Sequence, residues 1–249
     1  MGLAPVWRLR TDARGAGAPP GPERHVARSP GAPPEPARRT QSATGPVAAA
    51  TASLVADPRE EQILRMDWAA LKAKVAGCTD CRLRATCKQT VIGVGDEHAA
   101  WMLVGEAPGA EEDRLGEPFV GQAGKLLDNM LAAIGLKRGE NVYVANVLKC
   151  RPPGNRNPEP DEVARCSPYL VRQIELIRPK LVVAMGRFAA QTLLNTDATI
   201  ASLRGSLHRY AGVPLVVTYH PAYLLRSLSD KAKAWADLRF AVKTMQGLS

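Results

Sequence analysis

Side chains able to handle protons, hydrogen bonds or flat rings follow three apolar runs of this sequence. The first run leads into a glycine- and proline-rich loop, GEAPGAEEDRLGEPFVGQAG (105–124), and the third leads into HPAYLLR. The side chains concerned are Glu106, Glu112, Phe119, Asn146 and His220. A carboxylate or an imidazole can exchange a proton or stabilise a charge, and an amide carries both a donor and an acceptor. An acidic loop between two glycine-rich turns at the end of a strand is interpreted as part of a pocket.

Two common nucleotide-binding patterns are not met near this loop. The dinucleotide-binding pattern needs a third glycine, which the segment Gly93-Val-Gly95-Asp-Glu-His98 lacks. The phosphate-binding loop pattern needs a glycine at the position of Phe119. The pocket is therefore expected to hold a ligand of another kind.

The cysteines indicate a metal or cluster site. The chain has five, an odd number with uneven spacing, which favours ligation over a disulfide framework. Cys78 and Cys81 form a CxxC pair, Cys150 follows the second apolar run, and Cys166 lies in the next predicted helix. Four thiolates can bind either structural zinc or an iron–sulfur cluster, and spacing alone leaves both open.

The elements that must position these residues alternate between apolar runs and helical periodicity. Strands are predicted at 99–104, 142–148, 181–185 and 214–219. Helices are predicted at 62–76, 123–136, 159–178 (with an irregularity at Pro168), 187–194 and 231–246. Short, continuously apolar strands that alternate with helices indicate a parallel sheet covered on both faces. Ligands of such sheets bind beyond the carboxyl ends of the strands, so we expect the three polar segments to meet in one crevice.

Composition separates residues 1–58 from the rest. This segment holds 10 of the 20 prolines and 13 alanines but no lysine, and we expect a disordered tail before a folded domain at 59–249. The net charge of +9 favours a polyanionic partner. No run approaches the roughly 18 apolar residues of a membrane span, and the start lacks the apolar core of a secretory signal, so we expect a soluble, cytoplasmic protein.

Several motifs in a fixed order resemble one family. GEAPG, ED, PFVG and AG, followed by LKCRPP and then HPAYLLR, are similar to the family 4 uracil-DNA glycosylases, the iron–sulfur branch, over roughly residues 60–245. The resemblance implies an α/β protein with three α/β/α layers around a central, mainly parallel four-stranded sheet. It implies a monomeric repair enzyme that flips uracil out of single- or double-stranded DNA. The enzyme would hydrolyse the N-glycosidic bond and leave an abasic site for base excision repair.

The resemblance also assigns roles to the pocket residues. Phe119 would stack on the uracil ring, Asn146 would hydrogen-bond its edge, and Glu106 and Glu112 would orient it. His220 would lie against uracil O2 and stabilise the negative charge that develops on the leaving base.

Other roles concern the DNA and the cofactor. Leu224 would be the apolar wedge that fills the vacated base stack. Phosphate contacts are expected from Arg226, with Lys149, Arg151 and Arg156 as further candidates. A 4Fe–4S cluster would be bound by Cys78, Cys81, Cys150 and Cys166, whereas Cys87 matches no ligand position.

One departure keeps two alternatives open. Ala107 stands where the better-known branch has a water-positioning aspartate, so Glu106 is our candidate for orienting the water. A sister group traps uracil-DNA covalently through a histidine in an Arg-rich loop, but residues 195–209 lack the basic run before His208. The other alternative is a non-enzymatic iron–sulfur DNA-binding module, which would not require the pocket residues.

Overall fold

The computed structural model describes residues 57–248, which belong to one compact unit, Ser53–Ser249. The tail predicted at 1–58 lies outside the described residues except for Asp57 and Pro58. Pro58 opens helix α1 (Pro58–Leu64), and the Asp57 carboxylate caps it by accepting the Arg59 N–H at 3.0 Å. Helical structure therefore begins one residue before the predicted boundary at residue 59.

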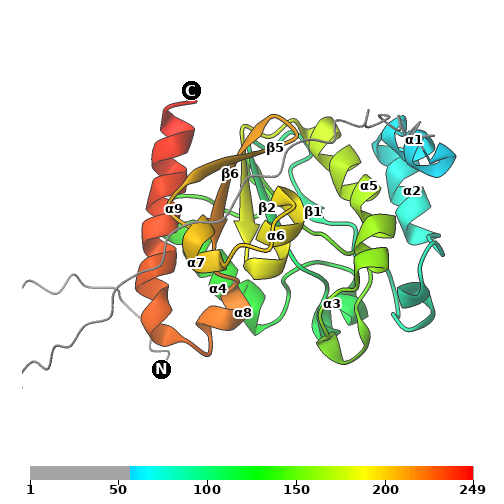
Figure 1. Ribbon diagram of the computed structural model, residues 1–249, viewed down its shortest axis with the longest axis horizontal. Helices are drawn as coiled ribbons and strands as arrows, with labels where there is room; N and C mark the ends of the chain where they lie inside the picture. Colours follow the sequence, from blue (N-terminus) through cyan, green and yellow to red (C-terminus); the bar gives the residue numbers. More distant parts are fainter. Residues whose placement is uncertain (1–56, 249) are drawn as a thin grey trace, which may run out of the picture. The chain divides into compact units, whose positions relative to one another are not determined.

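A mixed sheet forms the middle layer of the fold (Figure 1). Its strands are β1 (Val94–Gly95), β2 (Trp101–Gly105), β3 (Val142–Asn146), β4 (Leu181–Met185), β5 (Leu207–Tyr210) and β6 (Val213–Thr218). In the order β1-β3-β2-β4-β6-β5, the four central strands are mutually parallel and the two edge strands pair antiparallel. The predicted α/β fold with a central, mainly parallel sheet is confirmed, and the sheet is two edge strands wider than predicted.

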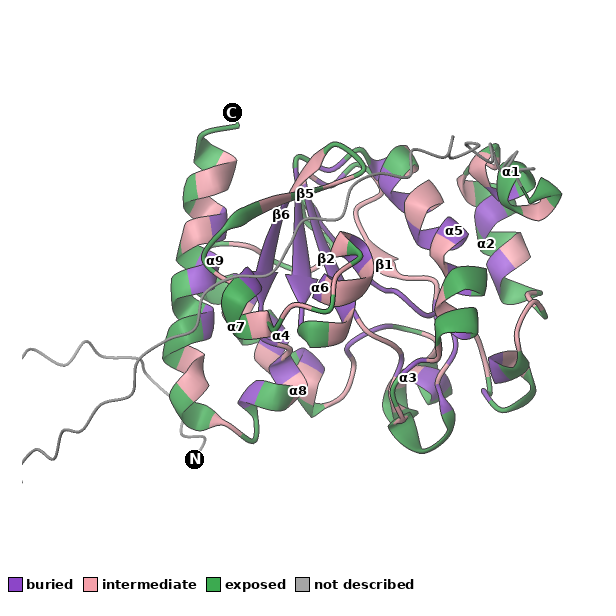
Figure 2. Cartoon of the chain, viewed as in Figure 1, coloured by how far each residue is buried: buried purple, intermediate pink, exposed green. Residues whose placement is uncertain are grey.

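Helices cover both faces of the sheet because its strands are apolar on both faces. Helices α4 (Gln122–Ala133) and α9 (Lys231–Gln246) pack on one face, and α5 (Pro160–Ile177) and α6 (Arg187–Leu194) on the other. Every residue of β2, β3 and β4 is buried, as the purple strands of Figure 2 show. This is the burial expected of parallel strands between two helical layers.

The helix predicted at 62–76 is wrong as a single element. The structure has α1 and a second helix, α2 (Trp68–Ala76), which are separated at Asp67. The Asp67 carboxylate accepts the Ala70 N–H at 2.8 Å and so caps a new helix. By contrast, α5 runs as one helix through Pro168.

Short elements complete the connections. They are η1 (Arg82–Ala85), α3 (Ala110–Leu115), η2 (Pro153–Asn155), α7 (Ile200–Leu203), α8 (Pro221–Leu224) and η3 (Leu228–Asp230). None of the helices between residues 57 and 248 has the length and apolarity needed to cross a membrane.

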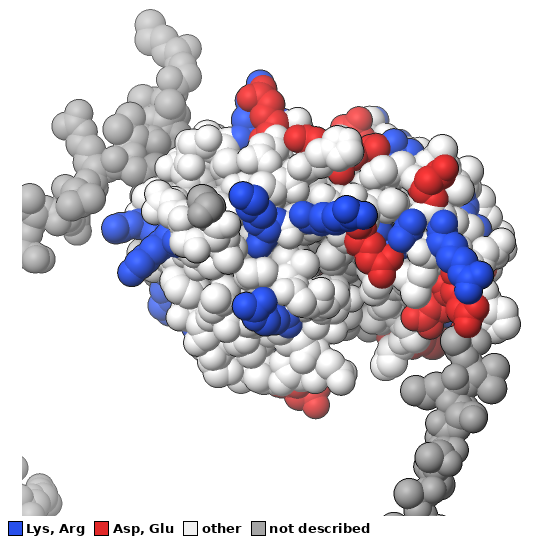
Figure 3. Space-filling view, turned by 90° about the horizontal axis from the view of Figure 1, so that it is seen from above, with Lys and Arg blue, Asp and Glu red and all other residues white. Residues whose placement is uncertain are grey.

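The register of the parallel strands sets the position of the polar segments. Gly105 at the end of β2 lies opposite Asn146 at the end of β3, and Met185 of β4 lies opposite Thr218 of β6. The loops that follow these four strands therefore open on the same edge of the sheet. The opposite edge is seen from above in Figure 3, where Lys and Arg side chains lie in separate places rather than in one patch.

Candidate active site

A cavity of about 720 Å³ lies at the carboxyl edge of the sheet. It is lined by residues from the loops after β2, β3, β4 and β6, so sequence-distant segments meet there as expected. All five predicted pocket residues are among those that line it: Glu106, Glu112, Phe119, Asn146 and His220. Its volume is in the range of small-molecule sites and suits one planar base with its sugar.

Glu112 organises the loop rather than standing free in the cavity. Its Oε2 accepts the Gly109 N–H at 3.1 Å, and its Oε1 accepts the N–H groups of Val120 and Gly121 at 3.0 and 3.2 Å. One carboxylate thus joins the first turn of α3 to the segment that follows Phe119. Three backbone donors already occupy its acceptor positions, so its main effect is to order the cavity wall.

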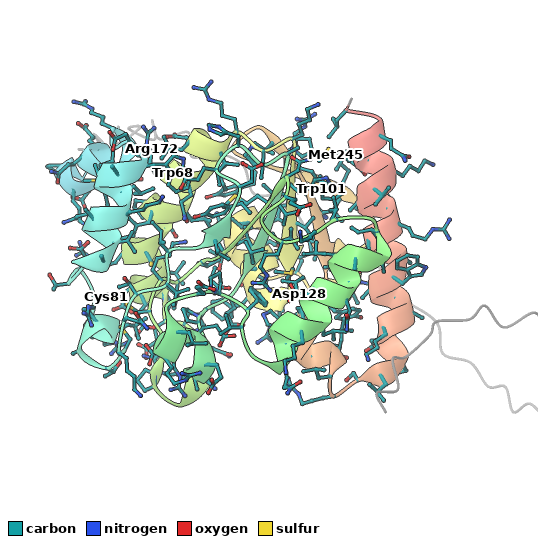
Figure 4. All side chains as sticks on the ribbon, turned by 180° about the vertical axis from the view of Figure 1, so that it is seen from behind. Trp68, Cys81, Trp101, Asp128, Arg172 and Met245 are labelled. Atoms are coloured by element: carbon teal, nitrogen blue, oxygen red, sulfur yellow. The ribbon has the colours of Figure 1, made fainter. Side chains whose placement is uncertain are left out.

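The backbone of Phe119 has a left-handed conformation that residues other than glycine rarely adopt. Its φ is +54° and its side chain is 5% exposed. Arg138 donates to the carbonyls of Pro118 and Phe119 at 2.7 and 2.9 Å. The same guanidinium also donates to Asp128, which is labelled on α4 in Figure 4. Position 124 must be glycine, because a Cβ on Gly124 would lie 1.7 Å from the Phe119 carbonyl oxygen. Such local strain persists only where the surroundings enforce it.

Asn146 lines the cavity and carries a buried, unpaired acceptor. Its side chain is 2% exposed, and its Oδ1 has no hydrogen-bond partner among the described residues. Gly105 allows this placement, since a Cβ there would lie 2.4 Å from Oδ1 and 2.6 Å from the Phe119 ring. A buried polar atom without a partner is destabilising unless a ligand or water satisfies it, so this oxygen indicates a ligand with a matching donor.

His220 is a neutral imidazole whose tautomer is set by the fold. Its Nδ1 accepts the Ala222 N–H at 3.1 Å at the start of α8, which leaves the hydrogen of the neutral ring on Nε2. Burial, with help from the nearby Arg226, lowers the pKa of His220 to about 4 although Glu112 opposes the shift. Gly186, with φ of +93°, admits the ring, because a Cβ there would lie 2.8 Å from the Cβ of His220. The site therefore offers a neutral N–H donor at ordinary pH.

Glu106 is a second group of the cavity whose pKa is shifted. Burial raises its pKa, and the positive charge of Arg187 partly offsets that effect. Ala107 beside it also lines the cavity and brings no polar side chain. Unlike Glu112, Glu106 does not hold the loop through hydrogen bonds to its backbone.

The residues after His220 differ in exposure from what the predicted wedge requires. Leu224 is 1% exposed and packs with Tyr219 and Ala234, so it cannot enter a base stack without opening this cluster. The exposed apolar side chains are its neighbours Tyr223 and Leu225, at 36% and 42%. The Tyr223 ring stacks on Tyr219 with centroids 5.1 Å apart.

The predicted phosphate contacts differ in position: Arg226 and Arg156 line the cavity, whereas Arg151 and Lys149 do not. The Arg156 guanidinium is bound to the buried Glu162 at 2.6 and 2.9 Å. Arg151 donates to Asn155 Oδ1 at 2.7 Å. Lys149 is 2% exposed and cannot reach a phosphate in this conformation, which corrects its predicted role.

The four predicted ligand cysteines come together in space. Cys78, Cys81, Cys150 and Cys166 line one small cavity with Lys149 and Tyr169, although 88 residues separate the first from the last. Cys81 lies in the turn after α2 (Figure 4). Cys87 does not line this cavity; it lies behind Cys150 in the same apolar cluster.

The surroundings of these thiols suit a cationic inorganic group. Burial raises the pKa values of Cys81, Cys150 and Cys166, so a strongly polarising cation is needed to keep them as thiolates. The Tyr169 hydroxyl donates to Asp80 at 2.8 Å and lies 3.3 Å from Cys78 Sγ. Between residues 57 and 248 no three cysteine, histidine or carboxylate side chains are grouped to hold a single metal ion. The four thiols around this small cavity are nonetheless the ligand types that structural zinc and an iron–sulfur cluster both take, so the residues fit either group.

Sequence reasoning missed the residues that act through others. Arg138 clamps the Phe119 backbone, Gly186 admits His220, and Arg187 faces Glu106. The glycine after the apolar run 181–185 was a usable signal for Gly186. Nothing in the sequence near Arg138 indicates that its guanidinium folds back over 19 residues.

Comparisons with known proteins agree with this geometry. The model of the uracil DNA glycosylase superfamily matches residues 92–239. The type-4 uracil-DNA glycosylase of Archaeoglobus fulgidus is 50% identical over 160 residues, which are 61% of this chain and 80% of the relative. Those of Pyrobaculum aerophilum and Thermotoga maritima are 40% and 41% identical over 70% and 64% of this chain, and over 92% and 84% of the relatives. The chain belongs to the uracil DNA glycosylase superfamily, and its similarity is to the type-4 enzymes.

Proposed function

We propose that this protein is a uracil-DNA glycosylase that takes an extruded uracil into the cavity at the carboxyl edge of the sheet. It hydrolyses the bond between uracil N1 and the deoxyribose C1′, which releases free uracil and leaves an abasic site in DNA. The protein acts as a monofunctional hydrolase, because water rather than an enzyme group receives the sugar.

The unpaired Oδ1 of Asn146 is the observation that carries this proposal. The edge of uracil presents an N3–H donor beside the O4 acceptor, and a side-chain amide matches both. Cytosine has no hydrogen on N3, so it would leave the buried oxygen unpaired. A site built to bond a particular N–H rejects an analogue that lacks it far more strongly than an apolar pocket could.

His220 supplies the main transition-state interaction. As the glycosidic bond lengthens, its electron pair passes to the base, and negative charge develops on uracil O2. The Nε2–H of the neutral ring donates to that oxygen, which stabilises charge present mainly in the transition state. The sugar cation then combines with water at C1′, and the proton lost from that water goes to solvent or to Glu106.

Glu106 orients the attacking water in this account. Its carboxylate lines the cavity, and Ala107 offers no competing acceptor. Phe119 provides the flat surface against which the uracil ring stacks, and Glu112 keeps the Phe119 loop in place. A bond that breaks largely before water attacks needs little base strength, so an oriented water is sufficient.

Contacts with DNA outside the cavity come from the α8 segment. Arg226 lies at the cavity with a side chain that can reach a phosphate. The wedge role predicted for Leu224 is better served by Leu225, because Leu225 is exposed whereas Leu224 is buried. The partner is uracil-containing DNA, single- or double-stranded, and the protein acts as a monomer.

Cys78, Cys81, Cys150 and Cys166 hold a 4Fe–4S cluster in this proposal, and zinc is the alternative occupant of the same thiols. When bound, the cluster supplies rigid cross-links between distant segments and takes no part in the hydrolysis. The cysteines hold the turn after α2, the segment after β3 and helix α5 together beside the pocket.

A single-turnover assay tests the proposed activity. An end-labelled oligonucleotide with one uracil is incubated with excess protein, treated with alkali and run on a denaturing gel beside an untreated sample. Strand cleavage only after alkali, without a shifted protein–DNA band, supports hydrolysis. A heat-stable shifted band without turnover would support covalent trapping, for which His208 lies on β5 with Nε2 2.7 Å from the Leu203 carbonyl oxygen. DNA binding without either product would support a non-enzymatic module.

A further inference from the structure

A buried ammonium group lies directly behind the base-reading residue. Lys149 is 2% exposed, and its Nζ donates to the backbone carbonyl of Asn146 at 2.7 Å and to Gln173 Oε1 at 2.6 Å. Fully buried lysines are rare because desolvation disfavours the charge, and here both partners are neutral. A leucine or methionine would fill the same space without that penalty, so packing alone does not account for the residue.

The second acceptor of the ammonium is itself fixed. Gln173 on α5 is fully buried, and its Nε2 donates to the Ile92 carbonyl at 2.9 Å and to the Tyr143 hydroxyl at 3.2 Å. These two acceptors set the orientation of the amide, so Oε1 has to face Lys149. A chain of buried, fully partnered polar groups of this kind is rigid.

The backbone on both sides of Lys149 is also held. The Val147 and Leu148 N–H groups donate to the Gly105 and Glu106 carbonyls at 2.9 and 3.0 Å. The Lys149 N–H donates to Cys166 Sγ at 3.2 Å. The segment between Asn146 and Cys150 is therefore fixed to the pocket loop at one end and to a cysteine at the other. The Asn146 carbonyl receives its bond from the ammonium within this segment.

We propose that Lys149 is a positioning residue for base recognition, which fixes the Asn146 peptide and thereby the position of the Asn146 side-chain amide at the cavity. The inference rests on the proposed function, because it concerns how the same pocket reads uracil. Lys149 touches no substrate; it acts through Asn146. Gln173 lies on helix α5, which also carries Cys166, and its hydrogen bond to Lys149 keeps the ammonium in place.

The test uses Lys149→Met, which keeps the volume of the side chain and removes its donor. Two measurements are made on the full chain: calorimetric binding of free uracil, and single-turnover excision from a uracil oligonucleotide. Iron content and melting temperature are measured on each variant. Tyr143→Phe is the matched control, because it removes a buried hydrogen bond of the same network without touching the Asn146 carbonyl.

Lys149→Met is expected to weaken uracil binding about 10- to 100-fold, the size of a lost bond to a charged group, while Tyr143→Phe leaves binding within about twofold. In a double-mutant cycle with Asn146→Leu, the excision defect of Lys149→Met is expected to disappear, since the residue on which it acts is gone. Unchanged uracil binding in Lys149→Met, an equal loss in Tyr143→Phe, or fully additive defects in the cycle would overturn the proposal.

Should Lys149→Met fail to fold, Gln173→Leu replaces it in the same measurements, because it removes the second partner and leaves the Lys149–Asn146 bond. A smaller loss of uracil affinity that vanishes with Asn146→Leu is then expected, and additivity would again overturn the proposal. Failure of the proposed function is distinguishable, because in that case the unaltered protein itself neither excises nor binds uracil.

Discussion

The rings of Phe119 and His220 contact each other directly, with centroids 5.4 Å apart and planes inclined by 30°. They come from the loops after β2 and β6, two strands that are not neighbours in the sheet. The aromatic wall and the imidazole donor are thus one unit whose geometry depends on both loops. The same contact limits the movement of the His220 ring.

This contact predicts that the two residues are energetically coupled. Excision defects of Phe119→Ala and His220→Asn should be less than additive in the double variant, with a coupling of about 0.5–1.5 kcal/mol. Asn is chosen because it can still cap α8. Single-turnover rate constants of the four proteins measure the coupling. Additive losses would mean that the ring contact has no bearing on the reaction.

The pKa of His220 predicts how stability and activity vary with pH. Because the folded-state pKa, about 4, lies below the ordinary value of 6.5, the unfolded chain takes up its proton first as pH falls. This contribution to stability is full above pH 6.5 and is lost progressively between pH 6.5 and about 4, by up to about 3 kcal/mol. Denaturant unfolding at several pH values measures it, with His220→Asn as the control. That variant should show a shallower loss, and excision by the unaltered protein should show no histidine titration between pH 5.5 and 8.

Arg138 is predicted to act on the reaction through the Phe119 backbone. Arg138→Met removes the donors to the Pro118 and Phe119 carbonyls and frees a strained segment to relax. Excision should fall about 10-fold or more, mostly in the single-turnover rate at saturating protein rather than in DNA affinity. Arg114→Met, at an exposed i,i+3 ion pair on α3, is the matched control and should leave both unchanged. A defect confined to DNA affinity would indicate that Arg138 binds phosphate instead.

Leu225 and Leu224 are predicted to differ in what their truncation affects. Leu225→Ala should reduce excision from duplex DNA and spare single-stranded DNA, because only a duplex has a base stack to refill. Leu224→Ala should lower the melting temperature, as expected for about 2–4 kcal/mol lost from a buried leucine. Melting curves and paired duplex and single-strand assays separate the two effects. Equal behaviour of the two variants would refute the assignment.

Substitution of Cys150 and of Cys87 is predicted to affect the cofactor differently. Cys150→Ser should lose the visible absorbance and the roughly four irons per chain expected of a 4Fe–4S cluster. Cys87→Ser should retain both, because Cys87 does not line the cysteine cavity. Metal analysis of the two variants and the unaltered chain measures this. Zinc at one equivalent in place of iron would instead support the alternative occupant.

The buried strands could be predicted from the sequence, and the exposed edge strands could not. The four central strands are buried on both faces, so their continuous apolar runs revealed them and their parallel arrangement. Strand β1 has two residues, and β5 (LHRY) is alternately exposed, so neither carries such a signal. The break between α1 and α2 was signalled by Asp67, a capping residue inside a helical pattern.

The site was predictable where a residue type carries the chemistry. Asn146 ends β3 and His220 follows β6 by two residues, and their types suggest roles directly. The orientation of a long side chain was not predictable. Lys149 follows Asn146 by three residues and was expected to contact phosphate. Its side chain points inward instead, because its Nζ donates to the buried Gln173 of α5. Leu224 differs from expectation for the same reason, since tertiary contacts decide which side of the chain is exposed.

The central claim is that Asn146 reads uracil inside this cavity, and release of free uracil tests it most directly. Single-turnover release is measured from matched oligonucleotides that carry uracil or cytosine, with the unaltered protein and with Asn146→Leu. The account predicts release of uracil alone by the unaltered protein, and at least a roughly 100-fold slower release by Asn146→Leu at a similar melting temperature. Equal rates for the two proteins, or no uracil release by folded, iron-loaded protein, would contradict it.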